Sequence, residues 1–320
     1  MLEIVIPLFK INWVTKAVLE GLNFHYSPKK IHIISTQNEI KFFKKLNTEH
    51  LPLWFYDEDN FFYEKFNFTK ENLLSDLIIK NKLYTKGWFY QQCLKIGAND
   101  VIKLPNKFMI WDADMLPVNP WPVADNKFAL LQDSSGGNPE IVKKWKIWIK
   151  EVLEIEPVYN HKSTFICHHM ILNQIHLNSF KKQLQNHYES KDNWLKLLIN
   201  SFNDYETFSE YWAYTSWVNK QEKNDLKYFE YKDYGLFHER FFDDGTGLFS
   251  FKLKEYLNIK NNIFFYPSYI EVKKFIEKTY GKNLPSTLSF EMSKRHLNKK
   301  VETIHIEEKR SKWNLRFNEF

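Results

Sequence analysis

Two aspartates, Asp112 and Asp114, stand one residue apart directly after a hydrophobic run, in the stretch FMIWDADMLP. Burying a carboxylate is costly unless it is paired or holds a cation, and two carboxylates this close repel each other. The Asp-x-Asp spacing allows both side chains to offer oxygens to one hard divalent cation such as Mg²⁺ or Mn²⁺. Because Asp is also common in turns, an ordinary turn after a strand explains the pair equally well.

A further carboxylate, Glu210 in FSEYWAY, stands where a helix is predicted to begin. Ser209 is a suitable N-cap and a carboxylate is favoured in a first helical turn, so a structural role would be a sufficient explanation. The same carboxylate could instead accept a proton as a general base. Asp243 and Asp244 are the reserve candidates for that role.

Polar side chains that could bind phosphate lie in KGWFYQQCLK. Gln91 and Lys95 are four residues apart and share one face of a predicted helix, and Lys86 stands just before it. A helix start with a Lys and a Gly can approach phosphate through backbone N–H groups and charge. A solvated polar face is the alternative. Two adjacent glutamines cannot both face one ligand.

Two histidines, His168 and His169, lie within the hydrophobic run FICHHMIL. If this run is a strand, its side chains alternate, so only one histidine can face a site. A hydrogen-bonded core histidine is the commoner alternative.

The elements that must position these residues follow a strand–helix–strand order. Residues 3–8 and 30–36 are short β-branched runs, and the segment between them has helical apolar spacing. This order predicts a parallel sheet, in which ligands bind at the carboxyl ends of the strands. The remaining predicted strands are 51–59, 108–111, 126–132 and 163–173, and the remaining predicted helices are 69–83, 87–100, 140–155, 190–202 and 209–221.

Composition is that of a soluble globular protein, with 320 residues, 43% hydrophobic and 26% charged. No apolar run approaches the roughly 18 residues of a membrane helix, and the N-terminus does not resemble a secretory signal. The two cysteines, Cys93 and Cys167, suit a reducing cytosol, so a cytoplasmic location is predicted. The last 50 residues hold 12 Lys or Arg against 7 Asp or Glu. This basic end could contact an anionic membrane peripherally at its inner face, or could be a solvated helix face.

The order of these motifs resembles that of GT-A-fold glycosyltransferases. KGWFYQQCLKI, WDADMLP, FICHHMIL and FSEYWAY look like a largely uncharacterised bacterial family assigned to that class, over roughly residues 1–245. The resemblance implies an α/β fold with a Rossmann-like, mixed but mostly parallel sheet flanked by helices. Residues 1–250 would form the catalytic domain, with a donor half over 1–125 and an acceptor half over 126–250. Residues 251–320 would be a basic helical extension.

The resemblance also implies an activity: transfer of a sugar from a nucleotide-sugar donor to a hydroxyl of a glycan or lipid-linked acceptor, as in bacterial surface polysaccharide synthesis. Mn²⁺ or Mg²⁺ would bind Asp112, Asp114 and His238, and Glu210 would be the base of an inverting displacement. The family often has an acidic pair where this chain has Glu210 and Tyr211, which leaves the stereochemistry open. A retaining enzyme would share the metal site without the base.

The remaining implied site residues fall into two groups. Those expected to bind the donor are Pro7, Leu8, Ser35, Thr36, Lys86, Gln91, Lys95, Trp111, Asp112 and Ala113, and those expected to line the acceptor side are Asp133, His168, His169 and Tyr211.

Two alternatives come from other functional classes. Nucleotidyltransferases that make nucleotide sugars share this fold but usually have a Gly-rich loop after the first strand, and PLFKINWV has no Gly. A non-enzymatic protein that binds nucleic acid or an anionic surface would use the basic C-terminal end. The sequence has no zinc pattern, aromatic-basic RNA motif or evident helix-turn-helix, so nucleic acid is not the expected partner.

Overall fold

The computed structural model describes residues 2–75, 77, 83–121, 128–132, 139–158, 165–166, 168–202, 207–230, 238–259 and 265–291. The chain forms two compact units, neither of them continuous in sequence. Unit 1 comprises residues 1–10, 28–112 and 122–230, and unit 2 comprises residues 11–27, 113–121 and 231–320. The domain boundaries expected near residues 125 and 250 remain predictions.

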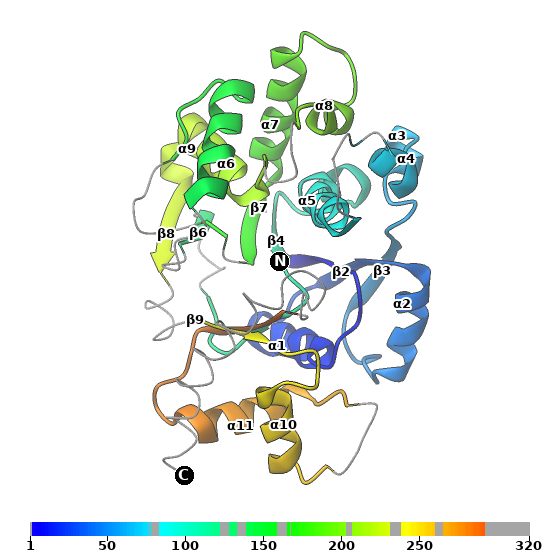
Figure 1. The fold of residues 1–320 in the computed structure, drawn as a ribbon, viewed down its shortest axis with the longest axis vertical. Coiled ribbons are helices and arrows are strands. Elements are labelled where there is room, and N and C mark those ends of the chain that lie inside the picture. The colour runs from blue at the N-terminus through cyan, green and yellow to red at the C-terminus, as the bar shows by residue number, and fades with distance from the viewer. Residues whose placement is uncertain are drawn as a thin grey trace. The chain divides into compact units, whose positions relative to one another are not determined.

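A five-stranded sheet is the centre of unit 1 (Figure 1). Its order is β3 (Leu53–Asp57), β2 (Lys30–Ser35), β1 (Glu3–Pro7), β4 (Lys107–Trp111) and β7 (His169–Asn173). All neighbours are parallel except β7, which is antiparallel to β4. The predicted mixed, mostly parallel sheet flanked by helices is therefore confirmed. Every residue of β1 is buried, as expected for a central strand.

Helices and a second, smaller sheet complete unit 1. The helices are α2 (Gln37–Phe42), α3 (Tyr63–Phe66), α4 (Lys70–Ser75), α5 (Leu83–Val101), α6 (Pro139–Val152), α7 (Gln174–His187), α8 (Trp194–Asn200) and α9 (Glu210–Gln221), with 3₁₀ turns at Phe43–Lys45 and Lys223–Asp225. Parallel strands β6 (Phe128–Gln132) and β8 (Leu226–Glu230) form the small sheet. Helix α5 contacts both β1 and α9, so it joins the sheet to the later helices.

Several predicted elements begin or end elsewhere in the structure. The helix predicted over 69–83 is represented by α4, which ends at Ser75. The helix predicted over 87–100 is α5, which already begins at Leu83, so Lys86 lies within the helix and not just before it. The helix predicted over 190–202 is α8, which begins only at Trp194. The strand predicted over 163–173 begins only at His169. His168 has a φ of 62°, a left-handed conformation outside the regular β region.

Close packing around α5 depends on a glycine. A Cβ placed on Gly97 would lie 2.6 Å from the ring of Phe62 and 3.1 Å from that of Trp194. Both rings are buried, so the helix approaches them closely only because this position has no side chain.

Unit 2 contains three helices and a three-stranded sheet within its described residues. The helices are α1 (Thr15–Tyr26), α10 (Leu248–Tyr256) and α11 (Tyr269–Tyr280), and the sheet order is β5 (Met115–Pro117), β10 (Thr287–Glu291) and β9 (His238–Phe242). Helix α11 begins with a capping box formed by Ser268 and Glu271. Over the residues that the structure covers, neither unit contains a helix with the length and apolarity needed to cross a membrane.

Candidate functional site

Asp112 lies at the carboxyl end of β4, held by contacts to two other segments of unit 1. Its backbone N–H donates to the carbonyl of His168 at 2.8 Å. Its Oδ2 lies 3.0 Å from His168 Nδ1, and its Oδ1 lies 2.7 Å from Lys95 Nζ. The carboxylate is thus enclosed between an imidazole and an ammonium group, with its side chain 13% exposed.

Lys95 reaches Asp112 from α5 and is itself almost completely buried, with 3% of its side chain exposed. It donates a hydrogen bond to Glu210 Oε1 at 2.8 Å and another to Tyr211 Oη at 3.3 Å. Its contact with Asp112 Oδ1 is an ion pair without the alignment of a hydrogen bond. One ammonium group therefore joins two carboxylates that are far apart in sequence. We call Lys95, Asp112, His168, Glu210 and Tyr211 the Lys95 cluster.

The charges of the Lys95 cluster decide which groups stay ionised. Burial would lower the pKa of Lys95, but Asp112 and Glu210 raise it above its ordinary value. Burial would likewise raise the pKa of Asp112, but Lys95 and His168 together lower it to about 2. Asp112 is consequently a poor proton acceptor near neutral pH.

Glu210 begins α9, and its position is fixed from α5. Its backbone N–H donates to Gln92 Oε1 at 3.0 Å, so Gln92 takes the capping role that the sequence suggests for Ser209. Ser209 has the extended backbone of an N-cap, yet its hydroxyl makes no cap hydrogen bond. Among the described residues, Glu210 Oε2 has no partner, whereas Oε1 is bound by Lys95. One carboxylate oxygen thus remains able to accept a proton.

His168 contacts Asp112 from a strained backbone position, whereas His169 lies in the core. A φ of 62° is uncommon for a residue other than glycine, and such conformations concentrate at functional sites. His169 is 3% exposed, and its ring centroid lies 4.6 Å from that of Trp111, its partner across β4 and β7. Of the two histidines, His168 therefore belongs to the cluster.

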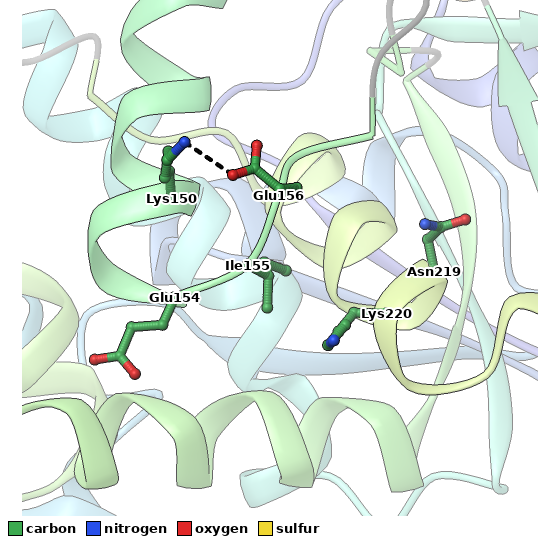
Figure 2. Close-up of a pocket in the computed structure, with 6 residues that line it drawn as sticks. All are labelled: Lys150, Glu154, Ile155, Glu156, Asn219 and Lys220. Atoms are coloured by element: carbon green, nitrogen blue, oxygen red, sulfur yellow. Dashed lines mark ion pairs between the residues drawn. The ribbon is translucent and has the colours of Figure 1, made fainter.

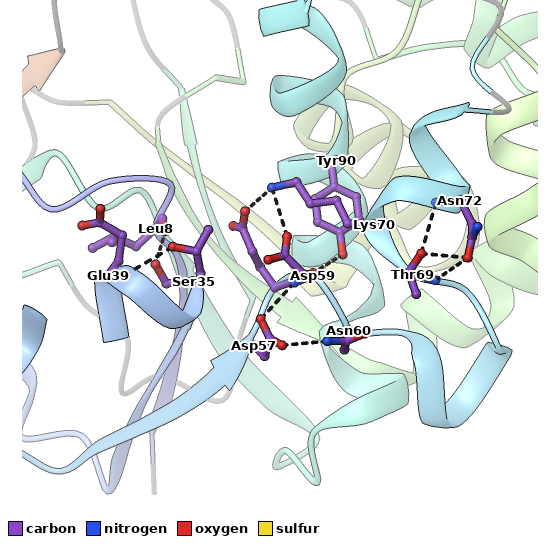
Figure 3. A network of polar contacts seen from close by, with 12 residues as sticks. Leu8, Ser35, Glu39, Asp57, Asp59, Asn60, Thr69, Lys70, Asn72 and Tyr90 are labelled. Carbon is purple, nitrogen blue, oxygen red and sulfur yellow. Dashed lines mark hydrogen bonds and ion pairs between the residues drawn. The ribbon is translucent and has the colours of Figure 1, made fainter. Parts of the chain in front are cut away.

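The residues expected at the ends of β1 and β2 have contacts that stabilise the fold. Ser35 is fully buried and its hydroxyl donates to the carbonyl of Leu8 at 2.6 Å, as Figure 3 shows. Thr36 caps α2 by accepting from the N–H of Glu39 at 3.4 Å. Pro7 is buried at the end of β1. Their predicted role in donor binding remains a prediction.

Polar residues that follow β3 at the same edge of the sheet were not expected (Figure 3). Glu58 is 4% exposed and pairs with Lys70, and burial raises the pKa of this carboxyl despite the pairing. Tyr90 on α5 donates its hydroxyl to the carbonyl of Glu58 at 2.5 Å. Asp57 accepts from Asn60 Nδ2 at 2.8 Å. These contacts join the end of β3 to α4 and α5.

Other predicted residues of unit 1 lie outside the Lys95 cluster. Lys86 Nζ donates to the carbonyl of Leu74 at 3.1 Å, and Gln91 is partly exposed on α5. Asp133 lies outside the described residues. The sequence favoured Gln91 over Gln92 as a site residue, but Gln92 is the buried one of the pair, with 1% exposed.

The remaining acidic residues and His238 belong to unit 2, as does Ala113 in the turn after Asp112. The backbone carbonyl of Asp114 accepts from the N–H of Phe290 at 2.8 Å. Both ring nitrogens of His238 lie within hydrogen-bond distance of hydroxyls on β10, Nδ1 at 2.8 Å from Thr287 Oγ1 and Nε2 at 3.2 Å from Ser289 Oγ.

The two reserve base candidates have local partners in unit 2. Asp243 is 2% exposed and accepts from the backbone N–H groups of Gly245, Gly247 and Ser250 at 2.8–2.9 Å, which orders the start of α10. Asp244 is exposed and accepts from the hydroxyl of Thr246 at 2.6 Å.

Within unit 1, the surroundings of Asp112 do not fit a metal site, and His238 in unit 2 likewise has protein partners. Each oxygen of Asp112 already faces Lys95 or His168, and both nitrogens of His238 face hydroxyls. In the part of the chain that the structure describes, no three His, Cys, Asp or Glu side chains gather where they could hold an ion. The predicted Mn²⁺ or Mg²⁺ requirement remains a prediction.

A surface hollow of about 520 Å³ lies near the C-terminal ends of α6 and α9 (Figure 2). It is lined by Lys150, Glu154, Ile155, Glu156, Asn219 and Lys220. Lys150 and Glu156 pair at 2.8 Å, with 65% and 79% of their side chains exposed. None of the predicted site residues lines this hollow, and its charged groups are solvated.

Comparison with known proteins gives one family and several distant structures. The family described as "Family of unknown function (DUF6492)" matches residues 14–247, and no protein with a curated description matches the chain.

Among solved structures, mouse xyloside xylosyltransferase 1 is 11% identical, with 82% of this chain and 95% of that chain covered and a TM-score of 0.40. The galactosyltransferase LgtC, solved with donor and acceptor sugar analogues, is 10% identical, with 90% and 87% covered and a TM-score of 0.40. The bifunctional glycosyltransferase WbbM is 11% identical, with 90% and 45% covered and a TM-score of 0.42. Likeness at these TM-scores does not assign an activity to this chain.

Proposed function

The chain belongs to the DUF6492 family, a family of unknown function, and on that premise we propose that it is a nucleotide-sugar-dependent glycosyltransferase with the Lys95 cluster as its catalytic centre. The observation that supports the proposal is that residues from separate motifs lie together in the structure. Four motifs that the sequence singles out separately supply Lys95, Asp112, His168 and Glu210, and these side chains meet within 2.7–3.0 Å. They meet at the carboxyl end of a sheet strand, where ligands bind in α/β folds.

Within this proposal, Glu210 is the general base. The cluster sets two carboxylates, Asp112 and Glu210, against the ammonium of Lys95, and the imidazole of His168 lies beside Asp112 only. The pKa of Asp112 is lowered to about 2, so Asp112 stays ionised near neutral pH and is a poor base. Glu210 Oε2, in contrast, has no partner among the described residues. Oε2 would take the proton from an acceptor hydroxyl as that oxygen attacks the anomeric carbon and the nucleoside diphosphate leaves.

The experiment is sugar transfer or donor hydrolysis measured with a panel of nucleotide sugars for the wild type and Glu210→Gln. We expect one donor to be turned over and the variant to lose 10²–10⁴-fold in rate, the usual contribution of a general base. Glu222→Gln is the matched control, because Glu222 is an exposed carboxylate at the other end of the same helix. A rate retained in Glu210→Gln would favour a retaining mechanism. No binding of any nucleoside diphosphate, together with salt-sensitive binding to DNA, RNA or anionic vesicles, would replace the enzyme with the anionic-surface alternative.

The proposal extends to an acceptor that is a glycan or a lipid-linked saccharide of a bacterial surface polysaccharide. The motifs' resemblance and the basic C-terminal end support it, although residues 292–320 lie outside the described structure. Removing residues 292–320 should then weaken sedimentation with anionic vesicles while leaving turnover of a soluble acceptor unchanged. Equal sedimentation of both proteins would remove the membrane from the proposal.

A further inference from the structure

The place that a divalent cation would take on Asp112 is already filled by a side chain. Lys95 Nζ lies between Asp112 Oδ1 at 2.7 Å and Glu210 Oε1 at 2.8 Å. Asp112 Oδ1 is buried from solvent, and Oδ2 faces His168 at 3.0 Å. An ion could therefore reach Oδ1 only by displacing Lys95.

The ammonium also has the contacts that a resident group needs. It is 3% exposed, donates to Glu210 and Tyr211, and lies 4.8 Å from the centre of the Tyr211 ring, a cation–π distance. A buried charge with this many partners is held strongly, since removing it would leave the carboxylate of Glu210 uncompensated and that of Asp112 with His168 alone.

We propose that Lys95 is the permanent cation of this centre: its ammonium, in place of a divalent metal ion, joins Asp112 to Glu210, and Asp112 is a positioning residue and not a metal ligand. The inference rests on the proposed function only in taking the cluster as the catalytic centre. Its test needs no sugar donor or acceptor, so the two proposals can fail separately.

The distances in the Lys95 cluster predict how a variant without the ammonium should bind an ion. An ion of the size of Mg²⁺ binds oxygen at about 2.1 Å, compared with the 2.7 and 2.8 Å of Nζ, so each carboxylate would have to move inward by roughly 0.6–0.7 Å to hold it. Removal of the Lys95 side chain therefore opens a place for an ion that the wild type excludes.

The experiment is a titration with MnCl₂, followed by electron paramagnetic resonance of the free ion. The proteins are the wild type, Asp112→Asn, Lys95→Ala and the double variant Lys95→Ala/Asp112→Asn. We expect the Mn²⁺ affinity of Asp112→Asn to lie within twofold of that of the wild type. Absence of Mn²⁺ binding in both proteins meets the same expectation. Lys95→Ala should gain a Mn²⁺ site that the double variant lacks. Lys103→Ala, an exposed Lys after the same helix, should gain none.

Two results would overturn the proposal. One is at least a tenfold loss of Mn²⁺ affinity in a folded Asp112→Asn, which would make Asp112 a metal ligand in the wild type. The other is a folded Lys95→Ala that gains no Mn²⁺ site. If Asp112→Asn does not fold, the Mn²⁺ titration of Lys95→Ala alone tests the proposal. If Lys95→Ala melts cooperatively only when Mn²⁺ is present, that result supports the proposal.

Discussion

Replacing Lys95 with Met should destabilise the protein by about 3–5 kcal/mol, the usual cost of removing one partner from a buried ion pair. The side chain is 3% exposed, so solvent does little to screen the loss. Asp112 would keep His168 as a partner at 3.0 Å. Glu210 Oε1 would keep none that the structure describes, and this uncompensated carboxylate is the main source of the cost.

A second substitution separates lost charge from lost packing. Glu210→Gln removes the carboxylate charge that Lys95 offsets while preserving the shape of the side chain. The double variant Lys95→Met/Glu210→Gln should therefore be less destabilised than the sum of the single variants by at least about 1 kcal/mol. Lys103→Met is the control, because Lys103 is exposed and should change stability by less than about 0.5 kcal/mol.

The assay is urea unfolding followed by tryptophan fluorescence, with the free energy of unfolding extrapolated to water. If the effects of the two substitutions simply add to within about 0.3 kcal/mol, Lys95 and Glu210 are not energetically coupled. The description of the cluster as one shared ion pair would then be wrong. A loss near 1 kcal/mol for Lys95→Met alone would refute the claim that its removal leaves a buried charge uncompensated.

Two further predictions concern packing and pH. Gly97→Ala should cost about 1–3 kcal/mol, because the new Cβ would lie 2.6 Å from Phe62 in a filled core, whereas Gly87→Ala in the same helix meets nothing within 4 Å and should stabilise by about 0.5–1 kcal/mol. The same urea assay measures both, and equal effects would contradict the packing argument. Burial, with Lys273 nearby, lowers the pKa of His25 to about 4 from its ordinary 6.5, so the unfolded chain binds a proton in that interval that the folded chain does not. Stability should therefore fall as pH drops from 6.5 to 4. The urea midpoints of the wild type and His25→Gln at pH 7, 5.5 and 4.5 measure this fall, which the variant should reduce. An unchanged pH dependence in the variant would show that His25 is not its source.

Much of the sheet of unit 1 could be predicted because its signals are local. Short β-branched runs predicted β1 and β2, and a short hydrophobic run predicted β4, each to within a residue or two of its ends. The start of β7 could not be predicted, because nothing in FICHHMIL shows that His168 adopts a left-handed φ. That conformation lets its ring meet Asp112, a contact across 56 residues of sequence.

The choice between the two adjacent glutamines shows the same limit. A four-residue spacing with Lys95 favours Gln91, and helical periodicity alone could not reveal that the N–H of Glu210 would meet Gln92 instead. The hydrogen bond joins residues 118 apart in sequence. Because the start of α9 packs on α5 at that point, tertiary contact and not the local N-cap pattern of Ser209 determines which residue caps Glu210.

The spacing of Asp112 and Asp114 was the strongest functional signal in the sequence, and it is also where a spacing argument is weakest. Two residues of separation permit a shared ligand but do not require one. The boundary between the two units falls directly after Asp112, so Asp112 belongs to the Lys95 cluster of unit 1, while the backbone of Asp114 bonds to β10 in unit 2. Each aspartate therefore has a place in its own unit, and the cation that offsets the charge of Asp112 is encoded 17 residues earlier, at Lys95. A motif of two carboxylates identifies a position where positive charge is needed, but whether a metal ion or a side chain supplies it depends on what the neighbouring helix carries at that point.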